Sequence, residues 1–331
     1  MFAGLFLVCV LFVFSISNNF FMWGGLELIS LSVMMMNLFL NTKMKGLTGM
    51  INYFLIQAIG GVMLLLMLLL EMGLADNYYF FQCSMMNSML FIGVGGLLMK
   101  LGLFPFYFQI IFVFFTLEGW QCFLLSVYPK LVPFLLLMGL VLLGGMYLFF
   151  FVGLLSILVG SFQGVLSTDL RALFGWSTIG HSGWLILCFY SGIFLFLAYF
   201  LYYVMVMSML WKSMEQTPKN FFLGSGMASS GMVLFVFMLG LGGFAPLMGF
   251  ILKLLLVYEL LGFISGWMMI SILLCMIGAI FFYTRMFQFM VNINNSYMGF
   301  RNSTKYTSMW TVKNIFMFFL YLFSSLFIFL I

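Results

Sequence analysis

The chain contains 331 residues, of which 66% are hydrophobic and only 6% are charged, and its formal net charge is +5. An ordinary soluble domain carries about 25% charged residues, so this composition excludes a soluble domain. The basic residues are scattered over short segments rather than clustered, which argues against a nucleic-acid surface. Because the apolar runs are continuous and do not alternate with polar residues, they predict an all-α polytopic membrane protein rather than a β-barrel.

The apolar runs predict eleven transmembrane spans, since one crossing needs about 20 residues. The first run has no basic leading region and no small-residue cleavage site, so we interpret it as a mature span and not as a signal peptide. Two segments, 85–117 and 226–262, are too long for one straight crossing, and we interpret each as one discontinuous helix. In chain order the predicted spans are residues 2–18, 22–41, 48–70, 85–117, 119–142, 143–163, 170–191, 193–211, 226–262, 264–289 and 312–330.

The distribution of Lys and Arg predicts the orientation. With eleven spans, the even-numbered loops and the helix ends beside them carry all the basic loop residues, whereas the odd-numbered loops carry only Glu71 and Asp76. The positive-inside rule then places the N-terminus inside and the C-terminus outside. Splitting either long segment into two crossings would put basic loops on both sides. The basic residues on the predicted inner side are Lys43, Lys45, Arg171, Lys212, Lys219, Arg285, Arg301, Lys305 and Lys313.

Besides charged residues near span ends, four charged residues lie deeper inside the predicted spans, where each costs roughly 2.5–3.5 kcal/mol on insertion scales. They are Glu27, Lys100, Lys130 and Lys253. A lysine near a helix end can extend its ammonium group to the interface. That explanation does not fit Lys100, because a long stretch of apolar or small residues lies on each side of it. We therefore expect these charges to have a function.

Four of the five prolines also lie within spans, close to the lysines. Proline removes a backbone donor, and irregular backbone survives at membrane depth only where protein or a water-filled cavity satisfies it. Broken helices beside intramembrane charges predict an ion-transport site. The glycine runs at 93–96 and 240–243 either allow close helix packing or supply the breaks. Pro105 follows Lys100, Pro129 and Pro133 bracket Lys130, and Pro246 precedes Lys253.

The single histidine, His181, shares a predicted span with Ser177, Thr178 and Ser182. A lone histidine can be a core residue whose hydrogen bonds are all made. Here the neighbouring hydroxyl residues and the absence of metal-ligand partners in the sequence favour a proton relay. Glu118 and Glu259 fall near span ends, where an interfacial charge is the alternative explanation.

The five cysteines are isolated from one another, which argues against a disulfide framework, a zinc site or an iron–sulfur ligand set. They are Cys9, Cys83, Cys122, Cys188 and Cys275. We interpret them as small apolar residues within helices.

Six motifs, in this order, identify a resemblance that covers most of the chain. They closely resemble the family of NADH dehydrogenase (ubiquinone) subunit 2, the mitochondrially encoded antiporter-like membrane subunit of respiratory complex I. The resemblance implies the short animal form with eleven spans, the fourth and ninth discontinuous, and antiporter-like inverted repeats with a first half at 1–163 and a second at 170–330. The motifs are "WGGLEL" (23–28), "NYFLIQA" (52–58), "MKLGLFPF" (99–106), "YPKLVP" (128–133), "LRALFGWSTIGHSGW" (170–184) and "LGGFAPLMGFILK" (241–253).

The resemblance implies a proton relay formed by Glu27, Lys100, Lys130, His181 and Lys253. Glu27 matches the essential glutamate of an early helix, Lys100 and Lys253 match the lysines of the two broken helices, Lys130 matches the linking lysine, and His181 the histidine between the halves. The chain departs from the family pattern at accessory positions, which affects the expected proton-entry residues. These positions are Asn52, Tyr107, Ala172, Ala245 and Met248.

The resemblance also implies the setting: a core subunit of proton-translocating NADH:ubiquinone reductase in the mitochondrial inner membrane, with the N-terminus on the matrix side and the C-terminus on the intermembrane-space side. This chain would hold no cofactor and no metal, because other subunits bind FMN, the iron–sulfur clusters and ubiquinone. Its expected partners are other membrane-arm subunits, including neighbouring antiporter-like subunits, and lipids such as cardiolipin.

Two other functions remain open at this point. A stand-alone cation/proton antiporter of the same ancestry would carry the same charges. The apparent loss of three N-terminal helices argues against it, as does the excess of Phe (46) and Met (32), which is typical of many mitochondrially encoded chains. A purely structural membrane scaffold would leave the proline-associated lysines unexplained.

Overall fold

The structure, a computed structural model, describes Val13 and residues 19–40, 44–75, 82–117, 119–142, 146–167, 170–216, 237–244, 247–262 and 266–297. Every regular element within these ranges is a helix, which agrees with the predicted all-α class. The first predicted span apart from Val13, the last predicted span, Pro246, Ala245 and Glu118 lie outside the described residues. So do Lys43, Lys219, Arg301, Lys305 and Lys313.

The helices follow the predicted spans along the chain. Their bounds are α2 (Asn19–Leu40), α3 (Met44–Ala75), α4 (Gln82–Leu101), α5 (Phe108–Thr116), α6 (Gly119–Val127), α7 (Leu131–Leu142), α8 (Met146–Leu166), α9 (Leu170–Leu187), α10 (Ile193–Gln216), α12 (Met248–Leu260) and α13 (Gly266–Tyr297), with short 3₁₀ helices η1 (Tyr128–Lys130) and η2 (Cys188–Tyr190).

Seven of these helical segments are long and apolar enough to cross a membrane, as judged over the described residues. Each corresponds to one of the predicted spans other than the two expected to be discontinuous. The segments 85–117 and 226–262 do not qualify among the described residues. In the first, α4 ends at Leu101 and α5 begins at Phe108, and in the second, a helical stretch that ends at residue 242 is separated from α12 by irregular backbone. The prediction that these two spans are discontinuous is therefore confirmed within the described residues.

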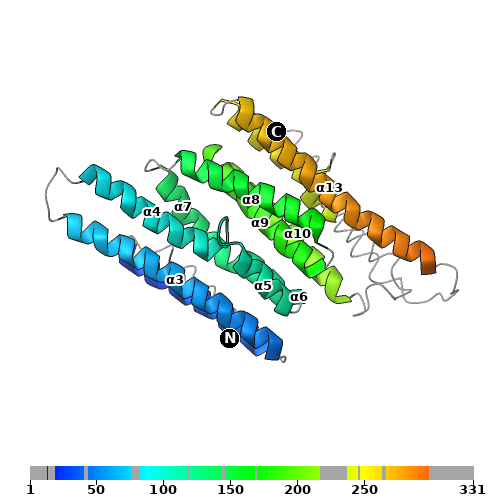
Figure 1. The fold of residues 1–331 in the computed structure, drawn as a ribbon, viewed down its shortest axis with the longest axis horizontal. Coiled ribbons are helices and arrows are strands. Elements are labelled where there is room, and N and C mark those ends of the chain that lie inside the picture. The colour runs from blue at the N-terminus through cyan, green and yellow to red at the C-terminus, as the bar shows by residue number, and fades with distance from the viewer. Residues whose placement is uncertain are drawn as a thin grey trace. The chain divides into compact units, whose positions relative to one another are not determined.

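The chain forms two compact units. The first comprises Met1–Gly160 with Ser167–Ile186. In it, α3 packs against α2, α4 and α5, while α4 also contacts α7 and η1. Figure 1 shows α3 and α4 running alongside each other. This unit contains Glu27, Lys100, Lys130 and His181.

The second unit comprises Ser161–Leu166 with Leu187–Ile331. Within its described part, α10 packs against α12 and η2. Close contacts depend on glycine here: a Cβ added at Gly249 would overlap the backbone carbonyl of Gly240. This unit contains Lys253.

The first break begins where α4 ends, at Gly102. Gly102 has a φ of 64°, which a glycine adopts without the penalty that a Cβ brings. The Leu103 N–H donates to the Leu98 carbonyl at 3.1 Å, and the Gly102 N–H donates to the Met99 carbonyl at 3.2 Å. These two bonds form a Schellman motif, which satisfies carbonyls at a helix end. Pro105 lies in the irregular segment that follows, so the glycine ends the helix before the proline is reached.

The second break has the same glycine conformation and the same pattern of Schellman hydrogen bonds. Gly243 has a φ of 81°. The Phe244 N–H donates to the Leu239 carbonyl and the Gly243 N–H to the Gly240 carbonyl, both at 3.1 Å. The glycine run at 240–243 thus supplies a break, whereas the run at 93–96 packs α4 against α3.

A third interruption separates α6 from α7 at Pro129, which lies in η1. Pro133 lies in the first turn of α7, where a missing N–H removes no intrahelical bond. The two prolines therefore belong to one interruption, with Lys130 between them.

Candidate functional site

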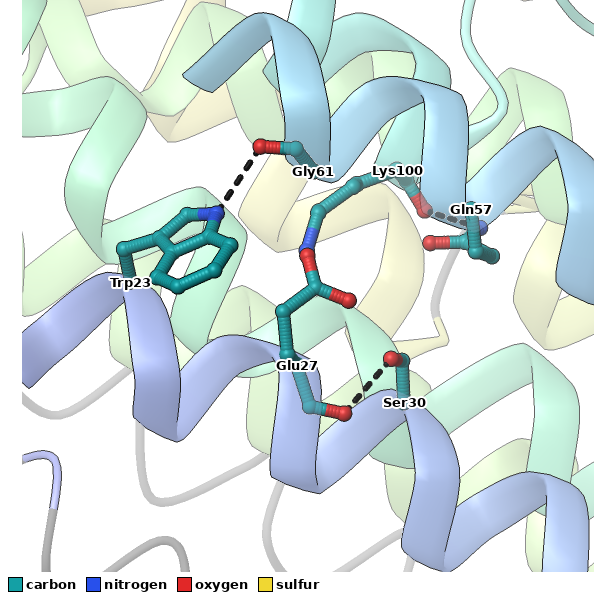
Figure 2. A network of polar contacts seen from close by, with 6 residues as sticks. All are labelled: Trp23, Glu27, Ser30, Gln57, Gly61 and Lys100. Atoms are coloured by element: carbon teal, nitrogen blue, oxygen red, sulfur yellow. Dashed lines mark hydrogen bonds and ion pairs between the residues drawn. The ribbon is translucent and has the colours of Figure 1, made fainter. Parts of the chain in front are cut away.

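An ion pair joins α2 to the end of α4. The Lys100 Nζ atom lies 2.5 Å from the Glu27 Oε1 atom, and the two residues are 73 positions apart in the sequence. The Lys100 side chain is 2% exposed and that of Glu27 is 23% exposed, both in the isolated chain. Figure 2 shows the two side chains extending toward one another from separate helices. A charge buried this deeply requires a partner, and Glu27 supplies it.

Two glutamines hold the end of α4 beside this pair. The Gln57 Nε2 atom on α3 donates to the Lys100 carbonyl at 3.0 Å. The Gln109 side chain on α5 donates to the Met99 carbonyl. The last carbonyls of a helix have no intrahelical donor. The glutamines therefore supply donors beside the Schellman bonds, and the backbone that carries Lys100 is tied to both α3 and α5.

Glycines bring α3 and α4 close together at the same level. A Cβ added at Gly60 would lie 3.0 Å from the Gly96 carbonyl oxygen and 3.2 Å from the Lys100 Cγ atom. A Cβ added at Gly96 would lie 2.8 Å from the Gly60 carbonyl oxygen. Small residues at such positions let helix backbones approach in a membrane, so Gly96, from the run at 93–96, serves close packing.

Lys130 is 2% exposed in the core of the first unit. Its Nζ atom donates to the Thr178 carbonyl on α9 at 3.3 Å. Because residues three positions apart lie on the same face of a helix, Thr178 and His181 are neighbours along α9. The structure thus places Lys130 one helical turn from the position of His181.

His181 is 3% exposed and lies between the polar residues predicted to accompany it. The hydroxyl groups of Ser177, Thr178 and Ser182 each donate to the carbonyl three residues earlier on α9, at 2.8 Å. These hydroxyls are therefore satisfied within their own helix.

Lys253 lies on α12 in the second unit and is 1% exposed. Its Nζ atom donates to the Leu241 carbonyl at 2.8 Å and to the Gly242 carbonyl at 3.2 Å. These carbonyls end the helical stretch that precedes Gly243. A helix C-terminus carries partial negative charge and favours a cation, so at this break a lysine interacts with the helix end itself.

The structure brings Glu27 and Lys100 into direct contact and sets Lys130 against the helix that carries His181. Of the accessory positions, Asn52 is exposed on α3 and Ala172 is buried on α9. The Tyr107 ring lies 5.5 Å from the Trp176 ring, measured between centroids. Glu259 is exposed near the end of α12.

The sequence reasoning missed four residues that shape the site: Gln57, Gln109, Gly61 and Gly102. Gly102 was detectable, because a glycine directly after "MKL" is a usual end signal for a helix. Polar Gln57 and Gln109 inside apolar spans gave a weaker signal. Gly61 forms a pair with Gly60 inside an apolar span, which indicates close helix packing, but the sequence did not show that Gly61 faces Glu27.

The chemistry available to these residues is proton transfer. Removal from water disfavours the charged form of a lysine, and a nearby carboxylate favours it. A lysine with a partner that can move can therefore hold or release a proton. Within the described ranges, no three His, Cys, Asp or Glu side chains are grouped so that they could hold a metal ion.

The family described as NADH:quinone oxidoreductase/Mrp antiporter matches residues 17–278 of the chain. NADH-ubiquinone oxidoreductase chain 2 of Pisaster ochraceus is 29% identical over 289 residues, which are 84% of this chain and 80% of that protein. The Anopheles gambiae protein of the same name is 30% identical over 313 residues, 89% of this chain and 88% of that one.

Solved structures share the fold at lower identity. A chain of respiratory complex I from Thermus thermophilus superposes with a TM-score of 0.75 at 20% identity, covering 94% of this chain and 75% of that one. A chain of the Mrp complex from Dietzia sp. DQ12-45-1b superposes with a TM-score of 0.74 at 12% identity, covering 85% of this chain and 58% of that one. At these identities the likeness concerns the fold.

Proposed function

The chain belongs to the NADH:quinone oxidoreductase/Mrp antiporter family, and from this premise we propose that it is a proton-translocating membrane subunit of respiratory complex I. The observation that carries the proposal is the buried Lys100–Glu27 ion pair at the break of a discontinuous helix. Relatives named NADH-ubiquinone oxidoreductase chain 2, which align over most of the chain, support the assignment to that complex.

The ion pair is the proposed switch. Unit charges about 4 Å apart at an effective dielectric of 20 interact by about 4 kcal/mol. Because this attraction favours the charged lysine, separating Glu27 from Lys100 would make release of the proton easier. A movement of α2 against α4 that doubled the distance between the two charges would about halve the attraction.

Lys100, Lys130, His181 and Lys253 form the proposed relay. The contact of Lys130 with α9 near His181 supports transfer within the first unit. Burial of Lys253 at the second break supports a corresponding site in the second half. The shared Schellman ends at Gly102 and Gly243 support an inverted repeat with halves at 1–163 and 170–330.

The energy for transport would come from quinone reduction elsewhere in the complex. FMN, iron–sulfur clusters and ubiquinone are proposed to bind to other subunits, so this chain contributes proton sites and no redox centre. Its proposed partners are membrane-arm subunits and lipids such as cardiolipin. Its proposed location is the mitochondrial inner membrane.

A stand-alone cation/proton antiporter is the second candidate, because the fold is shared with a chain of an Mrp complex. We expect detergent-solubilised mitochondrial membranes to place the chain in an assembly far heavier than itself on a native gel. NADH-dependent reduction of a tetrazolium dye should stain the same band. Migration of the chain as a small species without that activity would favour the antiporter.

The proposed orientation puts the basic loops on the matrix side. Cysteines introduced by Lys43→Cys and Lys219→Cys are expected to react with an impermeant maleimide only when the matrix face is open. A cysteine introduced by Asp76→Cys, in a chain whose native Cys83 has been replaced by alanine, should react from the intermembrane space. Labelling of positions 43 and 219 from opposite faces would contradict the eleven-span topology.

A further inference from the structure

One turn of α3 contacts both members of the ion pair. Gln57 donates to the Lys100 carbonyl, and a Cβ at Gly60 would lie 3.2 Å from the Lys100 Cγ atom. Gly61, on the same turn, faces Glu27. Figure 2 shows Gln57 and Gly61 on one helix, with the carboxylate and the ammonium group beside it.

Gly61 occupies the critical position in this turn. A Cβ added there would overlap the Glu27 Oε1 atom and would lie 2.7 Å from its Cδ atom. Oε1 is the oxygen that accepts from the Lys100 ammonium group. Any side chain at position 61 would therefore overlap the oxygen that forms the ion pair.

The same residue fixes the distance between α2 and α3. The Trp23 Nε1 atom donates to the Gly61 carbonyl at 2.8 Å, and Trp23 lies four residues before Glu27, on the same face of α2. The Glu27 carbonyl in turn accepts from the Ser30 hydroxyl at 2.8 Å. Helix α2, which carries Glu27, is thus hydrogen-bonded to α3 at Gly61. The Glu27 carboxylate occupies the space that a side chain at Gly61 would fill.

We infer that residues 57–61 of α3 form a cradle that sets the geometry of the Glu27–Lys100 pair, and that Gly61 is a positioning residue for proton transfer. Gln57 holds the backbone of Lys100, and Gly61 leaves the space in which the carboxylate meets the ammonium group. This inference rests on the proposed function and deepens it. It predicts that α3 tunes the switch although it carries neither of the two charges.

The contacts separate this role from simple helix packing. At Gly61 the obstructing atoms belong to the end of the flexible Glu27 side chain, which can move aside while the helices stay in place. At Gly60 the nearest obstruction is the Gly96 backbone carbonyl, which cannot move without separating α3 from α4. At Gly95 an added Cβ meets nothing within 4 Å.

The test compares Gly61→Ala, Gly60→Ala and Gly95→Ala in the complex. All three gain similar helix propensity. Assembly is measured on native gels, and NADH:quinone activity and proton uptake are measured in reconstituted vesicles. Gly61→Ala should assemble and lose coupled activity by about tenfold, as expected for a disturbed pair of contacting residues. Gly60→Ala should reduce assembly, and Gly95→Ala should match the parent.

A double-mutant cycle with Glu27→Asp distinguishes positioning from a general structural effect. Aspartate is one methylene shorter, so its carboxylate withdraws from α3 and leaves room for the new methyl group. In the Glu27→Asp background, Gly61→Ala should therefore lower coupled activity by less than about twofold. If Gly61→Ala does not assemble, restored assembly in the double variant supports the cradle and continued failure overturns it.

The inference would be overturned if Gly61→Ala lowered coupled activity equally in the parent and in the Glu27→Asp background. It would also be overturned if Gly61→Ala were as active as Gly95→Ala. Glu27→Gln is measured in parallel because it tests the proposed function by itself. Full proton uptake with Glu27→Gln would refute the ion pair as a switch. Loss with Glu27→Gln and none with Gly61→Ala would refute the cradle alone.

Discussion

Lys100→Met is expected to leave the complex assembled and to lower coupled turnover by about a hundredfold or more, the contribution of a well-placed proton-transfer group. Methionine keeps the length and apolar character of the lysine stem but cannot bind a proton. A blocked relay should also hold back quinone reduction, so NADH:quinone activity and proton uptake should fall together. Lys100→Arg should be impaired as well, because arginine does not release its proton in a protein.

The unpaired Glu27 carboxylate left by Lys100→Met calls for a control. The double variant Glu27→Gln with Lys100→Met restores electrical neutrality at the site. If loss of Lys100→Met activity came only from an unpaired charge, the double variant would recover it. We expect the double variant to remain inactive. Phe91→Leu, at an exposed ring on the same helix, should retain full activity. Full pumping by an assembled Lys100→Met complex would show that Lys100 is only structural.

Lys253→Met is expected to lower proton uptake about as much as Lys100→Met does, although Lys253 lies in the other compact unit. Its ammonium group donates to the Leu241 and Gly242 carbonyls. Methionine removes both the proton site and these donors, and a buried carbonyl left without a donor costs about 1–3 kcal/mol. The melting temperature of the complex should therefore fall as well.

Lys253→Gln separates the two effects. Glutamine keeps an N–H donor for the helix end but does not titrate. We expect it to recover part of the melting temperature while proton uptake stays low. Leu254→Met, at the exposed neighbouring residue of α12, is the matched control. Recovery of proton uptake together with stability in Lys253→Gln would mean that Lys253 only caps the preceding helix.

The broken helices show how far pattern reasoning extends. Excess length and the nearby prolines predicted that 85–117 and 226–262 are discontinuous, and the structure agrees within the described residues. The prolines were not the whole reason, since α4 ends at Gly102 in a Schellman motif before Pro105 is reached. The glycine run 240–243 was correctly considered as a possible break. The run 93–96 packs against α3 instead, and the sequence left that choice open.

The sequence by itself determined that this chain resides in a membrane, where its helices lie and which buried charges need an explanation. Those properties depend on local composition, because the cost of placing a segment or a lysine in an apolar medium is a sum over nearby residues. Only the tertiary structure decided that Glu27 and Lys100 are in direct contact, that Gln57 and Gln109 hold the end of α4, and that Gly61 faces the carboxylate. These contacts join residues on different helices, some of them far apart in the chain. Their energies exist only once particular helices have become neighbours, and no local pattern specifies which neighbours those will be.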